Sequence, residues 1–248
     1  MSKVKLETKG KVALVSGANR GIGKAIAVEL LERGASKVYA GARNINSLQE
    51  LTSKYGDRIV PVALDVTKNE SIAAAAGQIE NLDILVNNAG VFEGGGIFSD
   101  QAEESLEQNL DVNVWGVLKL SKAVVDQIKK EDDTAIINVS SLAGLGNMPM
   151  AATYSVSKAA VHSLTQGMRA ELADDNVLVM GVYPGPIDTD MARGLPMEKD
   201  SPENVAKNIV DGLEAGSEDV FPDVMASQVG SFYASNPKGV EVQFASFK

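Results

Sequence analysis

A glycine-rich turn between a short apolar run and a helical pattern constrains this chain most. Residues 12–15 (VALV) are typical of a buried strand, residues 16–23 (SGANRGIG) form the turn, and a helix is predicted over 21–32. Glycine allows a tight turn that a ligand can approach closely, and the N-terminus of a helix attracts phosphate. The turn is therefore a candidate phosphate-binding element, with an ordinary strand-to-helix turn as the alternative.

The spacing of the glycines narrows the kind of phosphate site. Gly17, Gly21 and Gly23 give Gly-x3-Gly-x-Gly, which differs from the Gly-x-Gly-x-x-Gly of other dinucleotide folds. A P-loop is excluded because Ala18 stands where its first glycine belongs and Ala25 provides no hydroxyl for magnesium. The order of strand, turn and helix still favours a dinucleotide site.

Short apolar runs and longer helical patterns alternate along the rest of the chain. This alternation predicts a parallel sheet with helices on both faces, joined by right-handed crossovers. We therefore expect an α/β fold with a doubly wound parallel sheet of about seven strands, in one domain over residues 1–248. Further strands are predicted over 37–40, 58–64, 82–86, 135–139, 177–182 and 220–221, and further helices over 46–55, 71–79, 101–130, 154–172 and 202–215.

Two helix starts carry recognisable capping residues. Thr67 and Glu70 have the spacing of a capping box ahead of the helix predicted from residue 71. Ser201 and Pro202 provide an N-cap and a proline at the first helical position of the last predicted helix.

Two irregular loops follow strands at the carboxyl edge of the sheet. They cover residues 93–96 and 184–200, and open α/β sheets bind ligands at this edge. We interpret residues 184–200 as a substrate loop. The tail over residues 223–248 is weakly patterned and is left without a predicted structure.

Charge and composition exclude several classes of partner. Lys and Arg number 23 against 33 Asp and Glu, which gives a net charge of −10, so a basic surface for nucleic acid or anionic lipid is not expected. There is no cysteine, and His162 is the only histidine, so we predict no metal site and a packing role for His162. The first residues lack the apolar core of a signal peptide, and the longest apolar run, 177–183, is too short to span a membrane. A cytoplasmic protein without membrane or nucleic-acid partners is expected.

The end of the second strand indicates the cofactor. Folds that prefer NAD place an acid there for the ribose 2′-hydroxyl, whereas an arginine accommodates a 2′-phosphate. Here Arg43 follows Gly41 and Ala42 with no acid, and Arg20 lies in the neighbouring glycine turn. Because the guanidinium group matches phosphate oxygens, we predict NADP(H) in preference to NAD(H). The alternative is that Arg43 is simply a solvated surface residue.

Tyr154, Lys158 and Ser141 form the candidate catalytic set. Tyr154 and Lys158 are four residues apart in a predicted helix and so lie on one face. A neighbouring ammonium stabilises a phenolate, and lowering the phenol pKa by ~2 units requires about 2.7 kcal/mol. Ser141 follows the fifth strand and places a hydroxyl at the same edge of the sheet.

Taken together, these residues resemble the short-chain dehydrogenase/reductase family in its compact single-domain form. The resemblance covers about residues 11–190 and implies a Rossmann-type fold. Ser16 stands where the family more often has threonine, and the C-terminal part lacks the Gly-Gly-rich ending of the family's tetrameric ketoacyl reductases. The motifs are the turn at 16–23, Asp65-Val66, Asn87-Asn88-Ala89-Gly90, Asn113, Ser141, Tyr154-x3-Lys158 and Pro184-Gly185.

The resemblance implies a role for each catalytic residue. Tyr154 would be the general acid in carbonyl reduction and the base in alcohol oxidation, and Ser141 would hold the substrate oxygen. Lys158 would bind the nicotinamide ribose and lower the pKa of Tyr154, and Asn113 would hold a water that connects Lys158 to solvent. The implied cofactor-binding residues are Gly17, Asn19, Arg20, Gly21, Ile22, Gly23, Arg43, Asp65, Val66, Asn88, Ala89, Gly90, Tyr154, Lys158, Pro184, Gly185, Ile187 and Thr189.

Some of these residues also have purely structural interpretations. Asp65 could cap the following helix, although Thr67 already fits that position. Asn113 could be a chance polar residue in a helix. Met191, Met197 and Leu195 could form an apolar lid over the substrate or simply anchor the loop.

The leading functional prediction is an NADPH-dependent carbonyl reductase that also oxidises alcohols, acting on a small-molecule carbonyl or alcohol substrate. The alternatives are a non-catalytic NADP-binding sensor or scaffold and an NAD-dependent alcohol dehydrogenase. A serine hydrolase is excluded because no Gly-x-Ser-x-Gly motif occurs. The helices over 101–130 and 154–172 resemble those that pair in the family's dimers, so a homodimer is expected, with a tetramer as the alternative.

Overall fold

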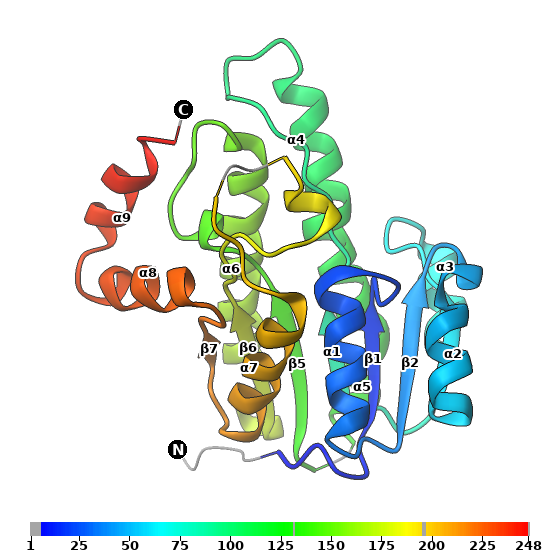
Figure 1. The fold of residues 1–248 in the computed structure, drawn as a ribbon. Coiled ribbons are helices and arrows are strands. Elements are labelled where there is room, and N and C mark those ends of the chain that lie inside the picture. The colour runs from blue at the N-terminus through cyan, green and yellow to red at the C-terminus, as the bar shows by residue number, and fades with distance from the viewer. Residues whose placement is uncertain (1–5, 131, 195–196, 248) are drawn as a thin grey trace.

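Seven short strands form one parallel sheet in the computed structural model, which describes residues 6–130, 132–194 and 197–247 (Figure 1). The strand order is β3-β2-β1-β4-β5-β6-β7, so the chain winds outward from β1 in both directions. The predicted doubly wound α/β fold is confirmed. The strands are β1 (Val12–Ser16), β2 (Lys37–Ala42), β3 (Ile59–Ala63), β4 (Ile84–Asn87), β5 (Thr134–Val139), β6 (Val177–Val182) and β7 (Asp219–Val220).

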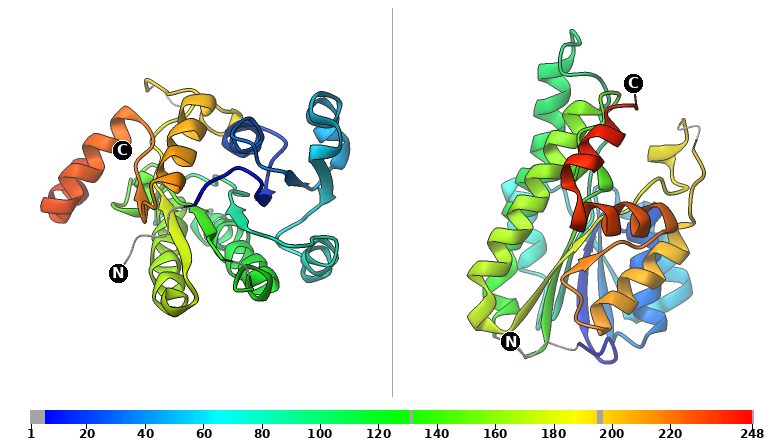
Figure 2. Two further views of the ribbon diagram at one scale, coloured as in Figure 1. Left: turned by 90° about the horizontal axis from the view of Figure 1, so that it is seen from below. Right: turned by 90° about the vertical axis from the view of Figure 1, so that its left-hand side faces the viewer.

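Helices cover both faces of this sheet (Figure 2). One face carries α1, α2 and α7, and the other carries α3, α5 and α6. The helices are α1 (Gly21–Glu32), α2 (Gln49–Tyr55), α3 (Asn69–Ala76), α4 (Ala102–Leu110), α5 (Gly116–Ile128), α6 (Ala152–Glu171), α7 (Pro202–Glu214), α8 (Val224–Ser235) and α9 (Pro237–Phe244). In the described part of the chain, no helix combines the length and the apolar character needed to cross a bilayer.

Alternating residues of each central strand fill two separate cores. Ala13 and Val15 of β1 belong to the core that includes α1 and α7, whereas Leu14 between them belongs to the core on the opposite face, which includes α5. All three side chains are fully buried. Because both faces of a parallel sheet are covered, its strands appear in the sequence as continuous apolar runs without polar alternation.

The long helix predicted over 101–130 is interrupted. A π-helical turn, Asp111–Trp115, separates α4 from α5 and contains Asn113. Such turns insert one extra residue into a helix and often occur at functional sites. The pattern of apolar residues does not reveal this insertion, because the helix continues on both sides of it.

The capping box predicted at Thr67 and Glu70 does not form. The helix α3 begins at Asn69, and its N-cap, Lys68, makes no capping hydrogen bond through its side chain. The Thr67 hydroxyl instead donates to Asp65 Oδ1 at 2.7 Å. Because Lys68 occupies the N-cap position, Thr67 lies one residue too early in the chain to cap α3.

The second predicted cap is confirmed, and the tail proves to be helical. Ser201 Oγ accepts from the backbone N–H of Asn204 at 3.1 Å, with Pro202 as the first residue of α7. Residues 224–235 and 237–244 form α8 and α9, which lie beyond the β7 edge of the sheet (Figures 1 and 2). The apolar pattern of α8 is weak because it also carries the exposed side chains of Val224 and Phe232.

Candidate active site

A cavity of about 630 Å³ opens at the carboxyl edge of the sheet. The glycine turn, the end of β2, the segments after β3, β4 and β5, the start of α6 and the loop after β6 all contribute to its wall. Every site residue predicted from the sequence lines this cavity except Asn113. Segments far apart in the chain thus converge because parallel strands all end at the same edge.

The glycine turn leaves room for a ligand that side chains would otherwise fill. Gly17 and Gly21 have φ angles of +66° and +54°, a region that side chains rarely adopt. A Cβ on Gly23 would lie 2.3 Å from Asn88 Nδ2 and 2.4 Å from the Gly17 carbonyl oxygen. The N-cap of α1, Arg20, makes no capping bond through its side chain, and the first turn holds no acid. The free N–H groups at this terminus therefore suit a phosphate.

Ser16 and Asn88 fasten the glycine turn to the end of β4. The Ser16 hydroxyl accepts from the backbone N–H groups of Asn88 and Ala89, both at 3.0 Å. The Asn88 side chain donates to the carbonyl oxygens of Ser16 and Gly17, at 2.9 and 3.3 Å. In the sequence Ser16 is recognisable only as one residue of the glycine-turn motif. The structure shows that its hydroxyl holds two segments of the cavity wall together.

The two arginines predicted to recognise phosphate lie at the same end of the cavity. Arg20 donates to Asp190 Oδ2 at 3.2 Å, but this ion pair is exposed and so contributes little stability. Arg43 is exposed directly after β2, where no acid follows. Burial alone would raise the pKa of Asp65, but hydrogen bonds from Thr67 and the charges of Lys68 and Arg43 hold it below its ordinary value. The donors at this end fit a dinucleotide with a 2′-phosphate.

Tyr154 and Ser141 lie close together at one end of the cavity, here called the catalytic end after these candidate catalytic residues. Ser141 follows β5, where its Oγ accepts from the backbone N–H of Ala143 at 3.2 Å. The ring of Phe92 packs edge-on against Tyr154, with 4.9 Å between the ring centres. Burial raises the pKa of Tyr154 to about 12, and hydrogen bonding to Ser141 opposes this rise. The phenol is therefore protonated at neutral pH.

Lys158 lies one turn after Tyr154 and is almost completely buried. Its ammonium donates to the Val139 carbonyl oxygen at 2.9 Å and lies 5.6 Å from the centre of the Tyr154 ring. Burial lowers the pKa of Lys158 to about 8. Burial dominates the pKa of Tyr154 and raises it, so the lowering expected from Lys158 does not appear in this structure.

Asn113 is buried behind the cavity wall. Its side-chain oxygen accepts from the Val91 N–H at 2.9 Å, and its amide group donates to the Val91 carbonyl at 3.1 Å and to Ser157 Oγ at 2.9 Å. Both side-chain N–H groups are thus used within the protein. The side chain joins the segment after β4 to α6, next to Lys158.

The loop after β6 closes the other side of the cavity. Pro184, Gly185, Ile187 and Thr189 line it, as do the methionines at 148, 150, 191, 197 and 225. Two residues of the predicted lid, Met191 and Met197, therefore line the cavity, whereas Leu195 lies outside the described residues. Asp223, which is buried, accepts from the Gly185 N–H at 2.8 Å and so ties this loop to the start of α8.

Sequence reasoning missed one whole wall of the cavity. The tail, which had no predicted structure, contributes side chains from both α8 and α9, and Phe92 contributes from the segment after β4. No local signal marks these residues, because their place depends on how two short helices pack. The tail residues in the wall are Met225, Gln228, Val229, Phe232, Gln243, Phe244 and Phe247.

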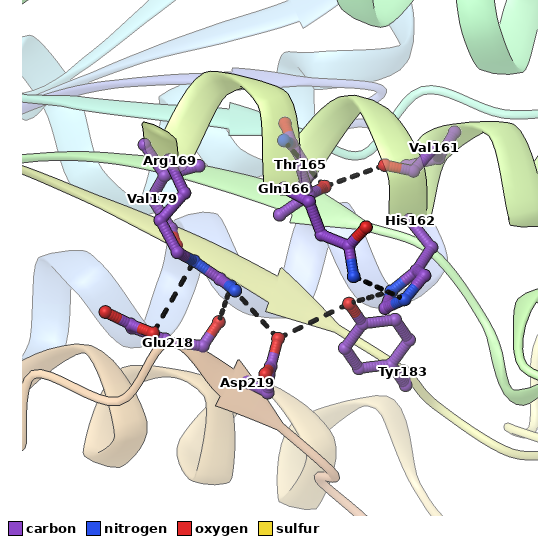
Figure 3. Close-up of polar contacts among 10 residues, drawn as sticks. Val161, His162, Thr165, Gln166, Arg169, Val179, Tyr183, Glu218 and Asp219 are labelled. Carbon is purple, nitrogen blue, oxygen red and sulfur yellow. Dashed lines mark hydrogen bonds and ion pairs between the residues drawn. The ribbon is translucent and has the colours of Figure 1, made fainter. Parts of the chain in front are cut away.

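His162 packs as predicted and also makes a hydrogen bond. Its Nδ1 lies 2.6 Å from the Tyr183 hydroxyl, and the two rings meet edge-on with 5.4 Å between their centres (Figure 3). Tyr183 also contacts Asp219, to which Arg169 donates at 3.0 Å. Burial lowers the pKa of His162, so the ring is neutral at pH 7. This network links α6 to β6 and β7.

A cavity with a glycine turn at one end and a Ser-Tyr-Lys set at the other defines a class of protein. A family model described as "short chain dehydrogenase" matches residues 11–200. The chain belongs to the short-chain dehydrogenase/reductase family and is an oxidoreductase of that family.

Individual relatives extend this assignment. FabG of Vibrio cholerae, a 3-oxoacyl-[acyl-carrier-protein] reductase, is 40% identical over 198 residues, covering 78% of this chain and 80% of the relative. An uncharacterized oxidoreductase of Staphylococcus aureus is 35% identical over 211 residues, covering 82% and 90%. A short chain dehydrogenase from Burkholderia cenocepacia, solved in complex with NADP, is similar with a TM-score of 0.90 at 35% identity, covering 97% of this chain and 100% of that one.

Proposed function

We propose that this protein is an NADP(H)-dependent oxidoreductase that reduces a small-molecule aldehyde or ketone, and oxidises the corresponding alcohol in reverse. The observation that carries the proposal is that Ser141, Tyr154 and Lys158 line the same cavity as the glycine turn. The bound cofactor would supply the hydride, and the protein would supply position and protons. The NADP in the Burkholderia cenocepacia relative supports this choice of cofactor.

The phosphates would be held by the glycine turn and the two arginines. Backbone N–H groups at the start of α1 would bind the pyrophosphate, as in other dinucleotide folds. Arg20 and Arg43 would bind the 2′-phosphate, for which Arg20 would give up its exposed ion pair with Asp190. Asp65 would contact the adenine. The absence of an acid directly after β2 removes the partner that a free 2′-hydroxyl needs.

Proton donation would come from Tyr154. Its raised pKa keeps the phenol protonated, so it can donate to the substrate oxygen as negative charge develops there. An alkoxide is far more basic than a phenolate, so this transfer is favourable even from a weakly acidic phenol. The Ser141 hydroxyl donates to the Pro184 carbonyl at a long 3.4 Å, and it would turn to the same substrate oxygen.

Lys158 and Asn113 would act behind Tyr154. Lys158 keeps two N–H donors beyond its bond to the Val139 carbonyl, and these would hold the nicotinamide ribose. Asn113, predicted to hold a relay water, uses both its side-chain donors on Val91 and Ser157. We therefore assign its side chain a positioning role, in which it fixes the start of α6 that carries Tyr154 and Lys158.

Replacing Tyr154 by phenylalanine tests the proposal. NADPH oxidation is followed with a panel of aldehydes and ketones, and Tyr154→Phe is expected to lower kcat by roughly 10²–10⁴-fold. The Kd for NADPH should stay within about twofold, since the ring still packs on Phe92. Unchanged turnover would refute the acid role. Tight NADPH binding without turnover of any substrate would instead support the sensor or scaffold.

We also propose that the protein forms a homodimer through the α4–α5 column and α6. Trp115, the last residue of the π-helical turn, and Val156 on α6 are 51% and 38% exposed, and such a contact would cover them. Light scattering measures the molar mass in solution. A tetramer is the alternative result, and a monomer would contradict the proposal.

A further inference from the structure

The helices α8 and α9, here called the C-terminal hairpin, are packed onto the catalytic loop. A small core of their own joins them to Leu142, which follows Ser141, and to Tyr183, which precedes Pro184. The Tyr183 hydroxyl is fixed in turn by His162 and Asp219 (Figure 3). The hairpin is therefore attached to both segments that border the catalytic end of the cavity.

Hydrogen bonds at both ends reinforce this attachment. Asp223 accepts from the Gly185 N–H at 2.8 Å and caps α8 by accepting from the Ala226 N–H at 2.8 Å. After α9, the Phe247 carbonyl accepts from the Met150 N–H at 3.1 Å. The hairpin thus forms a fixed wall, and this wall comes entirely from residues beyond the family match, which ends at residue 200.

The cavity is lined by most of the methionines and phenylalanines that the structure describes. Of the residues that the structure describes, five of the seven methionines and four of the six phenylalanines line it. The phenylalanines are Phe92 beside Tyr154, Phe232 and Phe244 from the hairpin, and Phe247 just after it. Methionine adapts to irregular apolar shapes, and phenylalanine presents a large rigid surface. This composition suits a bulky apolar group.

The charged side chains of the cavity lie away from the hairpin wall. Within the described part of the chain, the charged residues lining it are Arg20, Arg43, Asp65, Asp190 and Lys158. The first four lie at the glycine turn and the ends of β2 and β3 or pair with that end, and Lys158 belongs to the catalytic set. The hairpin contributes only Gln228 and Gln243 as polar side chains. A carboxylate or phosphate placed against this wall would lose water without gaining a counter-charge.

We propose that the substrate is an uncharged ketone or aldehyde whose carbonyl carries a bulky apolar group, such as an aromatic ring, bound against the C-terminal hairpin. This inference rests on the proposed carbonyl reduction and specifies its substrate class. The carbonyl lies at Ser141 and Tyr154, and the apolar group contacts Met225 and Phe232. An acyl thioester, the substrate type in the name of the Vibrio cholerae relative, is a different class and becomes an outcome of the test.

Four probes separate size from charge in the wild-type protein. They are 2-butanone, acetophenone, 4-acetylbenzoate and the acetoacetyl thioester of N-acetylcysteamine, each assayed with NADPH. We expect kcat/KM for acetophenone to exceed that for 2-butanone and for 4-acetylbenzoate by about tenfold or more. A rate for 4-acetylbenzoate or the thioester equal to or above that for acetophenone would overturn the inference. If neither these probes nor any other carbonyl compound is reduced, the result would instead count against the proposed function.

Hairpin variants then locate the apolar group. Phe232→Ala should lower the ratio of kcat/KM for acetophenone to that for 2-butanone by about fivefold or more. The control Val242→Ala, at a residue of α9 that is 65% exposed and outside the cavity wall, should leave this ratio unchanged.

A second variant tests the inference even if Phe232→Ala disturbs the hairpin, because it is expected to gain activity. Gln228 is exposed at the cavity wall, so Gln228→Lys should leave the fold intact. The new ammonium should raise the relative rate with 4-acetylbenzoate about tenfold, whereas the uncharged control Gln228→Met should not. Unchanged ratios in both Phe232→Ala and Gln228→Lys would place the substrate elsewhere and overturn the inference.

Discussion

Replacing Lys158 by methionine is expected to stabilise the cofactor-free protein while inactivating it. Lys158 is only 6% exposed, and its ammonium donates a hydrogen bond to the Val139 carbonyl. Burial lowers its pKa from 10.5 to about 8, which corresponds to about 3 kcal/mol by which folding disfavours the charged form. Losing the hydrogen bond costs about 1 kcal/mol. Lys158→Met should therefore be about 2 kcal/mol more stable at pH 7.

The stability advantage of Lys158→Met over the wild type should decrease as the pH rises. Below about pH 8 the lysine is charged in both the folded and the unfolded chain, so the wild-type protein bears the whole cost of the buried charge. Between about pH 8 and 10.5 the folded protein releases the proton before the unfolded chain does, and wild-type stability rises. The advantage of Lys158→Met should shrink through this window and disappear above it.

Urea denaturation at a series of pH values measures the effect. Lys122→Met, at an exposed lysine of α5, is the matched control and should change the free energy of unfolding by no more than about 0.5 kcal/mol. The reasoning is refuted if Lys158→Met is no more stable than the wild type at pH 7. An advantage that persists undiminished above about pH 10.5 would refute it as well.

Three further outcomes are expected. Arg43→Ala should raise the Kd for NADPH roughly 10- to 100-fold and leave the Kd for NADH nearly unchanged, and equal weakening of both would contradict the phosphate site. Because the raised pKa keeps Tyr154 protonated, carbonyl reduction should vary little between about pH 6 and 8, whereas alcohol oxidation should rise by up to about tenfold per pH unit. An oxidation rate independent of pH would contradict this assignment. Gly23→Ala should abolish NADPH binding in a fluorescence titration, since the new methyl would lie 2.3 Å from Asn88 Nδ2, whereas Gly167→Ala, with no heavy atom within 4 Å of its added Cβ, should bind normally.

The catalytic end of the site shows how far local spacing carries a prediction. Tyr154 and Lys158 share a helix, so their separation of four residues alone places them on one face. Ser141 joins them because it ends a strand of the same parallel sheet. The direction of the Tyr154 pKa could not be predicted in this way, because it depends on how completely the ring is removed from water by residues such as Phe92.

Asn113 and Thr67 also show where prediction from the sequence ends. The sequence identified both residues as candidates for a role, but it did not predict their hydrogen-bond partners. Asn113 bonds to Val91 and to Ser157, which is 44 residues away, and Thr67 bonds to Asp65 instead of capping α3. A polar side chain takes the best acceptor or donor that folding brings near it, and sequence spacing does not rank the candidates.

The sequence alone therefore determined the sheet, the glycine turn and the candidate catalytic residues. Each of these follows from a backbone period or a short spacing, which any chain with those residues would share. Only the tertiary structure decided the wall that α8 and α9 add to the cavity, the partners of Asn113 and the protonation of Tyr154. These depend on burial and on contacts between residues far apart in the chain. Tyr183 and Asp219, for example, are in contact although they are 36 residues apart.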